Sequence, residues 1–497
     1  MSEFSLLSPL LLGLLLLGPA AAQTAPAMPA RVTGAPVVGP VLSLETLLPL
    51  LREAPGWRAA DLTYRAAELS LQSARTRAGL TLSVGGSASA VKVPWDSGEW
   101  SASSAVTLSA ALSVLPWSPA LEAVRSAERA LGAASTELRG ARAALTLQLA
   151  QAYAGARSAA ASLALAEAQA ALAAQGLQVA QAQRAQNLLS QENLLDRQGA
   201  QEQAQAGVAQ ARRALEVAAG QLRRLLGRDV PLPTDPQAYA PLGAELLPAE
   251  LRALAGAALN EADLLRRALV ARPEVVRAQV GLSDAQIALE AARRAAGLPD
   301  VTASVQAGQL SDAQGRSGRT ISAGLGVRSG VLSAQASLPL RDTGNIPNGV
   351  ALNLSGTFTL LGRTEDQAVA QARLGAQQAA LALDTARQAV ELEVRTRLAE
   401  LQNDQGALTA LSTALTRAQT ALDSARARLS AGLATPLEVR QAELGLLQAR
   451  TTLNAALAQV TLAALALALA TGQLDPLLLT PLPVFPPTVS PLPGGRS

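Results

Sequence analysis

The apolar positions along this chain follow two different periods. Long stretches rich in Ala and Leu, with Gln, Arg and Glu between them, have the spacing of amphipathic helices. The two longest run from about residue 119 to 187 and from about 365 to 430. At 1.5 Å per residue each would reach on the order of 100 Å. No globular domain needs that length, so the pattern predicts helices that cross a compartment.

Shorter segments between the helices alternate between apolar and small polar residues. Residues 80–90, 106–114 and 350–360 each place Leu, Val or Ala on one side and Ser, Thr or Asn on the other. This period predicts strands with two open interpretations. One is a membrane β-barrel with its apolar side towards lipid and its polar side towards a wet lumen, and the other is a half-exposed soluble hairpin.

The second half of the chain has a longer strand region than the first. It contains two additional strand candidates, "TISAGLGV" at 320–327 and "VLSAQASL" at 331–338. They could form a long surface hairpin or extra strands of a barrel, and the sequence leaves both possibilities open.

The chain also repeats itself. Residues 55–80 match residues 273–298 at a constant offset, pairing Pro55 with Pro273 and Arg75 with Arg293. Each half has a helix, strands, one very long helix, a break and another helix. The predicted division is as follows: 1–22 signal peptide, 23–43 flexible N-terminal segment, 44–227 first repeat with strands in 80–115, 228–260 Pro-rich linker, 261–472 second repeat with strands in 301–361, and 473–497 Pro-rich disordered tail.

The N-terminus has the features of an export signal. An apolar run from Leu10 to Leu17 precedes three small residues ending at Ala22, which predicts cleavage there and Gln23 as the new N-terminus. Glu3 departs from this pattern, because it stands where a signal normally carries positive charge. The apolar run is shorter than the roughly 20 residues that a membrane span requires.

One later segment, 451–474, has no charged residue. Its polar residues Asn454, Gln459 and Thr461, and its continuity with a charged helix upstream, favour a buried bundle helix over a transmembrane helix. The mature chain is therefore predicted to have no membrane-spanning helix.

Composition removes most chemistry from consideration. The chain has no Cys and no His, which excludes thiolate nucleophiles, Cys/His metal sites and His-based proton transfer, so we expect no enzyme, metal or cofactor. Aromatic residues make up 2% of the chain, and Lys92 is its one lysine. The arginines alternate with acidic residues along the helices, as on a solvated face, and no nucleic-acid binding is expected.

The stretch "RLSAGLATPLEVRQAELGLLQAR", residues 428–450, interrupts a helix and resumes it at once. Gly432 can adopt the left-handed conformation that ends a helix. Thr435 can cap the next helix, with Pro436 in its first turn. Glu438 then falls in that first turn, near the positive end of the helix dipole. The stretch predicts a tight helical hairpin.

The order of these elements resembles the TolC-type outer-membrane efflux protein family, over essentially the whole mature chain up to Gly472. The opening of the second hairpin, with Gly432, Thr435 and an acidic Glu438, is its most specific local match. The resemblance implies a mainly α fold with membrane β: long helical hairpins form a periplasmic tunnel, and strands contribute to a trimeric barrel in outer-membrane lipid. It implies a homotrimer that works with an inner-membrane transporter and a periplasmic adaptor protein. Its function would be a passive exit duct for small molecules or proteins.

The resemblance also places a pore aperture at the helical tips. Three copies of Glu438 would form an acidic ring, although a role in capping its own helix remains an alternative. The family's further acidic position and its gating arginine fall at Gln441 and Ala434. In the first half, "NLLSQENLLDRQGA" predicts a second, less sharply marked turn near Asn193, and supplies Glu192 and Asp196 near this turn, which has no Gly or Pro.

A competing interpretation is a secreted or periplasmic coiled-coil structural or adaptor protein whose strands form a soluble domain. The two similar halves favour the channel, because adaptors usually have one helical hairpin.

Overall fold

The computed structural model describes residues 41–92, 95–98, 100–242, 260–297, 300–310, 318–339, 347–357 and 364–474. The chain divides into units 1–40 and 41–497, and all described residues belong to the second. The predicted signal peptide, the N-terminal segment up to residue 40, residues 243–259 of the linker and the tail from residue 475 lie outside the described residues.

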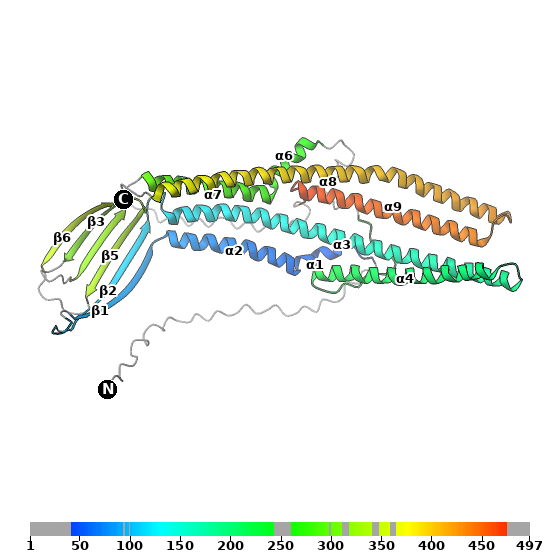
Figure 1. Ribbon diagram of the computed structural model, residues 1–497, viewed down its shortest axis with the longest axis horizontal. Coiled ribbons are helices and arrows are strands. Elements are labelled where there is room, and N and C mark those ends of the chain that lie inside the picture. The colour runs from blue at the N-terminus through cyan, green and yellow to red at the C-terminus, as the bar shows by residue number, and fades with distance from the viewer. Residues whose placement is uncertain are drawn as a thin grey trace, which may run out of the picture. The chain divides into compact units, whose positions relative to one another are not determined.

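The described residues of the first half contain four helices, which are labelled in Figure 1. They are α1 (Leu44–Arg52), α2 (Pro55–Ala78), α3 (Pro119–Ala185) and α4 (Gln191–Leu226). The Ser43 hydroxyl caps α1 by accepting from the Thr46 N–H, and Pro55 starts α2 where no N–H is needed. Gly227 ends α4 in the left-handed conformation at φ 71°.

The second half repeats this order with α6 (Glu261–Ala271), α7 (Pro273–Gly297), α8 (Thr364–Ser430) and α9 (Pro436–Ala470). A short 3₁₀ helix, η1 (Pro236–Ala238), lies in the linker. Helices α3 and α8 both have 67 residues, so each extends about 100 Å. The two very long helices expected from the sequence are therefore present.

The core lies where the two halves meet. Helix α3 packs against α2 and α4 of its own half and against α7 and α9 of the other, and α8 packs against α6, α7 and α9. Small residues at helical spacing on α3, such as Ala156 and Ala160, are fully buried and let neighbouring helices approach closely. Because aromatic residues are scarce, this seam consists mainly of Leu and Ala side chains.

Helix α9 is long and apolar enough to cross a membrane by length and composition alone. Its C-terminal part is instead buried in the helical core, including Leu465 and Leu467. Burial against other helices thus accounts for its apolar character, as expected for segment 451–474.

Tyr153 on the long helix α3 forms hydrogen bonds with the linker and with the residues before α1. Its buried hydroxyl lies 2.8 Å from the carbonyl oxygen of Leu42 and 2.7 Å from that of Ala240, and can donate to either. Backbone hydrogen bonds also join Leu42 to Ala238 and Ala240. The Tyr239 ring packs on Tyr153 with centroids 6.0 Å apart, and the Tyr239 hydroxyl donates to the carbonyl of Pro233.

These two tyrosines predict a loss of stability in alkali. Burial raises the pKa of Tyr153 and of Tyr239 from 10.0 to about 12, so the folded protein keeps protons that the unfolded chain releases. Their contribution is complete below pH 10 and is lost as the pH rises towards 12. We expect Tyr153→Phe to weaken this alkaline decline in melting temperature, as followed by circular dichroism.

At neutral pH the same variant should lose about 1 kcal/mol of folding stability, because the Ala240 carbonyl loses its hydroxyl donor. The matched control is Tyr64→Phe on α2, since Tyr64 forms no hydrogen bond with another described residue. An alkaline melting curve for Tyr153→Phe identical to that of the unmodified protein would contradict the prediction.

The strands form one antiparallel sheet of six in the order β1-β2-β5-β4-β3-β6. Their bounds are β1 (Thr81–Lys92), β2 (Trp100–Ser113), β3 (Asp300–Gln309), β4 (Thr320–Gly326), β5 (Val331–Pro339) and β6 (Asn348–Thr357). The first half provides one hairpin, and the second provides four strands. The predicted class, long helical hairpins with strands inserted in each of two repeats, is confirmed.

Candidate functional site

The two faces of the sheet differ in polarity along most of their length. The strand registers put Leu82 opposite Ala110, Leu108 opposite Ala336, and Val305 opposite Leu352, all on one face. The other face carries pairs such as Ser83 with Ser109, whose hydroxyl oxygens lie 2.7 Å apart. Each strand continues this division, because successive side chains point to opposite sides of a pleated sheet.

The apolar face is uncovered in the single chain. Val84 is 74% exposed, and Leu352 and Leu354 are each 78% exposed. A surface of this kind is typical of an interface with lipid or with another protein. With a small-polar opposite face it fits a membrane wall that has water on its inner side.

The second helical tip forms as its sequence predicts. Gly432 adopts φ 69°, and the N–H of Leu433 donates to the carbonyl of Arg428 at 2.7 Å, which closes the end of α8. Thr435 caps α9 with its side chain, and Pro436 is the first residue of the helix. Val439 is buried with Leu422 and Leu446 in a small cluster that holds the two helices together.

Glu438 at this tip is fully engaged in local contacts. Its backbone N–H donates to the Thr435 hydroxyl at 3.3 Å, and its carboxylate accepts from the Thr435 N–H at 3.2 Å, so the two residues form a capping box. The other carboxylate oxygen lies 3.6 Å from the Arg428 guanidinium. Glu438 therefore caps α9, and its charge is balanced by Arg428, a partner that the sequence reasoning missed.

The first tip lies slightly earlier than the sequence reasoning placed it. The turn occupies residues 186–190 rather than the neighbourhood of Asn193, which lies in the first turn of α4. Asn187 adopts φ 58° in the role of Gly432, and the Ser190 hydroxyl accepts from the Asn193 N–H in the role of Thr435. Both substitutes are chemically apt, because Asn tolerates the left-handed region and Ser is a strong N-cap.

A signal for this turn was present in the sequence. Asn187 and Ser190 have the same spacing as Gly432 and Thr435, although neither residue is the Gly or Pro that usually marks a turn. The correct register of the tip follows from capping chemistry rather than from the helix-breaking residues alone.

Glu192 and Asp196 lie on α4 beyond this turn, and both are exposed. Within the described part of the chain neither forms an ion pair or a side-chain hydrogen bond. Because they are four residues apart, they share one face of the helix. Among the described residues, the carboxylates without a basic partner are thus at the first tip, whereas Glu438 at the second tip is paired with Arg428.

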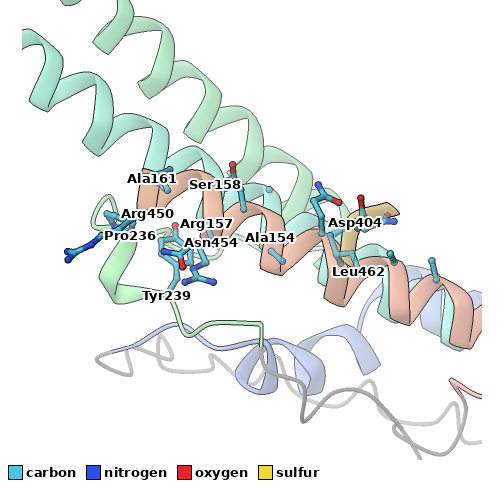
Figure 2. Close-up of a pocket in the computed structure, with 18 of the residues that line it drawn as sticks. Ala154, Arg157, Ser158, Ala161, Pro236, Tyr239, Asp404, Arg450, Asn454 and Leu462 are labelled. Atoms are coloured by element: carbon cyan, nitrogen blue, oxygen red, sulfur yellow. The ribbon is translucent and has the colours of Figure 1, made fainter. Parts of the chain in front are cut away.

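A groove of about 900 Å³ lies between α3, η1, α8 and α9, and Figure 2 shows side chains that line it. Arg157, Asp404 and Arg450 line it and form no ion pair with another described residue, whereas Arg397 contacts Glu400 at 2.8 Å. Tyr239 lies at its wall, and burial raises the pKa of its hydroxyl from 10.0 to about 12. The groove is an open surface along the helices where charged and amide side chains alternate with alanine and leucine. The sequence reasoning did not foresee it, since its charges come from segments far apart in the chain.

The described residues contain no cluster of three or more acidic residues placed to hold a metal ion. The notable features are thus an amphipathic sheet, two capped helical tips and a groove of mixed polarity.

Comparison with known proteins gives one family. The sequence model described as "Outer membrane efflux protein" matches residues 49–228 and 264–473. No curated protein matches the chain.

Several solved structures share the fold. The chain is 20% identical to the outer membrane protein VceC from Vibrio cholerae, with 86% of this chain and 96% of that chain covered and a TM-score of 0.61. The chain is 13% identical to the CmeC outer membrane channel of Campylobacter jejuni, with 86% of this chain and 85% of that chain covered and a TM-score of 0.61. It is 22% identical to the MtrE outer membrane channel of Neisseria gonorrhoeae, with 86% of this chain and 89% of that chain covered and a TM-score of 0.59. At these identities the similarity concerns the fold.

Proposed function

This chain belongs to the outer membrane efflux protein family, and from that membership we propose that it is the outer-membrane channel subunit of a multi-component efflux or type I secretion system. It is a transport protein rather than an enzyme. Three copies would form a passive duct through which small molecules or proteins leave the cell.

The observation that carries this proposal is the polarity of the sheet. One face is apolar on every strand and the other carries Ser, Thr, Asn, Gln and Gly, as a barrel wall requires between lipid and a wet lumen. A soluble coiled-coil stalk or adaptor would have to cover the exposed Leu352 and Leu354 with another domain. Outer-membrane lipid covers them without any further element.

The long helices supply the second part of the duct. Helices α3 and α8 continue from strands β2 and β6 and extend about 100 Å to the two tips. We place them in the periplasm, where three copies would enclose a tunnel lined by polar residues such as those of the groove.

The tips are the proposed docking points for a periplasmic adaptor protein and an inner-membrane transporter. The residues after the two left-handed positions, Leu188 and Leu433, are 72% and 71% exposed. An apolar side chain at the apex of each hairpin is costly in water and suits a protein partner.

Localisation and assembly test this proposal directly. Membrane fractionation should recover the full chain with the outer membrane. Unheated samples should migrate as a trimer on denaturing gels and heated samples as a monomer, and cross-linking should give three bands. A soluble monomer would contradict the proposal.

The tips also predict which carboxylates set ion selectivity. In planar bilayers we expect Glu192→Gln combined with Asp196→Asn to lower the cation preference severalfold, because these carboxylates have no basic partner among the described residues. Glu438→Gln should leave the preference nearly unchanged, since Arg428 already balances that charge.

Arg428→Gln is the matched control. It exposes the charge of Glu438 without adding an acidic residue, and should raise the cation preference. The opposite pattern, in which Glu438→Gln lowers the preference and the double variant does not, would assign the aperture to the second tip alone.

A further inference from the structure

The β4–β5 hairpin has no counterpart in the first half of the chain. In the first half, β1 and β2 join α2 directly to α3. In the second half, β3 follows α7 and β6 precedes α8, so these two strands correspond to β1 and β2. The strands β4 and β5 are therefore an insertion in the second repeat.

This insertion lies inside the sheet. Strand β5 pairs with β2 over nine residues, from Ala105 opposite Pro339 to Ser113 opposite Val331, and β4 pairs with β3 from Thr302 to Gly308. Hydrogen bonds between Gln309 and both Gly318 and Arg319 continue the second ladder. The inserted hairpin thus separates the strands of the first repeat from those of the second.

The turn of the hairpin is tied to both repeats. The Gly330 carbonyl accepts from the N–H groups of Val114 and Leu115 at 3.0 and 3.1 Å, where β2 leads into α3. The Trp117 indole donates to the Val327 carbonyl at 3.1 Å, and the Val327 N–H donates to Val301 of β3 at 2.9 Å.

Two further contacts fix this turn. The Arg328 guanidinium donates to the carbonyl of Ala295 at the end of α7. Gly330 adopts φ 67° so close to its neighbours that a Cβ would meet that of Leu115 at 3.0 Å and that of Ser118 at 3.1 Å. A loose surface hairpin would have none of these constraints.

The hairpin also continues both faces of the sheet. Ile321, Ala323 and Leu325 of β4 lie on the apolar face, and Ile321 is 66% exposed. Ser322 and Gly324 lie on the polar face with Ser333 and Gln335 of β5. The lipid-facing and lumen-facing surfaces therefore extend unbroken across β4 and β5.

The two edges of the sheet are suited to each other. All neighbouring strands are antiparallel, so the first and last of six strands, β1 and β6, run in opposite directions. Strand β6 has no charged residue and no proline, and β1 has only Lys92 at its end. Edge strands that stay unpaired normally carry charged residues or proline, which prevent pairing with another chain. Because β1 and β6 have almost none, these edges are suited to pairing with other strands.

We infer that β4 and β5 are wall strands of the barrel, so that three copies of the chain close eighteen strands by antiparallel pairing of β1 in each copy with β6 in the next. This inference rests on the proposed function, because the copies that complete the wall are those that form the channel. Without the insertion, three copies would close only twelve strands.

The insertion widens the pore. With strands about 4.8 Å apart and tilted by about 40°, eighteen strands give a backbone diameter of about 36 Å, and twelve give about 24 Å. Barrels of sixteen to eighteen strands are wide enough for an open aqueous channel. The inserted hairpin would thus set the width of the outer exit and the size of what can leave.

Two measurements on the full chain test this inference. Electron cryo-microscopy of the trimer in lipid nanodiscs should resolve eighteen wall strands. Because the chain has no Cys, single substitutions can be labelled selectively with a membrane-impermeant maleimide. We expect Ser322→Cys to be labelled from the lumen and Ile321→Cys to be protected by lipid.

Pairs of cysteines test the closure between copies. Ser83→Cys in β1 with Asn353→Cys in β6 should form cross-links between copies, whereas Ser83→Cys with Ser322→Cys in the middle of the sheet should not. All three residues lie on the polar face, so they differ only in strand position.

The outcomes separate the two proposals. A trimer in the membrane with twelve wall strands and equal labelling at positions 321 and 322 would overturn the inference and leave the channel function intact. A chain that neither trimerises nor enters the membrane would overturn the channel function itself.

Discussion

Leu352→Arg is expected to prevent stable insertion of the protein in the outer membrane. Leu352 lies near the middle of β6 on the apolar face, opposite Val305, and is 78% exposed in the single chain. An arginine facing lipid near the bilayer midplane costs about 2–4 kcal/mol per copy, because its charge loses its hydration. The heat-modifiable trimer band should be lost or should melt at a clearly lower temperature.

The neighbouring residue provides the matched control. Asn353 lies on the same strand but on the polar face, opposite Ser304, so Asn353→Arg places the same charge in the wet lumen. That variant should still form trimers and should shift ion selectivity towards anions. Equal effects of the two substitutions on assembly would mean that the faces are not exposed to lipid and water as proposed.

Arg272→Ala is expected to have the second largest effect, by loosening the junction between the helices of the second repeat. Arg272 lies between α6 and α7, and its side chain is only 12% exposed. It contacts the carboxylates of Glu274 at 3.0 Å and of Glu393 on α8 at 2.7 Å, and it lies 3.5 Å from the carbonyl oxygen of Leu469 on α9. One guanidinium thus contacts three helices, α7, α8 and α9, from the junction of α6 and α7.

Removing this guanidinium leaves two carboxylates close together without their cation, and we expect a loss of about 2 kcal/mol per copy in the stability of the detergent-solubilised protein. Arg395→Ala is the control. Arg395 contacts Glu261 at 2.8 Å, but the two side chains are 55% and 49% exposed, so its loss should cost less than about 1 kcal/mol. Equal thermal shifts for the two variants would show that burial at Arg272 contributes nothing.

The helical tips show how much of a site can be predicted from local sequence. Gly432, Thr435 and Pro436 specify the second turn by steric and capping preferences, so the turn was predictable from a few residues. Asn187 and Ser190 meet the same requirements at the first tip, but less distinctively, and the predicted turn was displaced by a few residues.

The charge state of the tips was not predictable in this way. Both Glu438 and Glu192 stand in the first turn of a helix, yet only Glu438 has a basic partner at its tip among the described residues. That difference depends on where the end of α8 brings Arg428, which is a property of the packed hairpin. The sequence pointed to Glu438 as the aperture residue, and we instead propose Glu192 and Asp196 for that role.

By itself, the sequence determined the elements and their faces. The period of apolar residues predicted the long helices and the amphipathic strands, the helix breakers predicted the second tip, and the constant offset predicted the two repeats. The elements and the second tip depend on neighbours within a few residues, and the repeat is visible by comparing one half of the sequence with the other.

Only the tertiary structure decided which strands are neighbours and which charges meet. All six strands share the same alternation of apolar and small polar residues, so many pairing orders would satisfy the pattern equally well. The order was fixed by contacts between residues distant in sequence, above all the hydrogen bonds that tie the turn at Val327 and Gly330 to both repeats. Strand order depends on residues far apart in the sequence. For that reason the position of the β4–β5 hairpin inside the sheet is visible only in the tertiary structure.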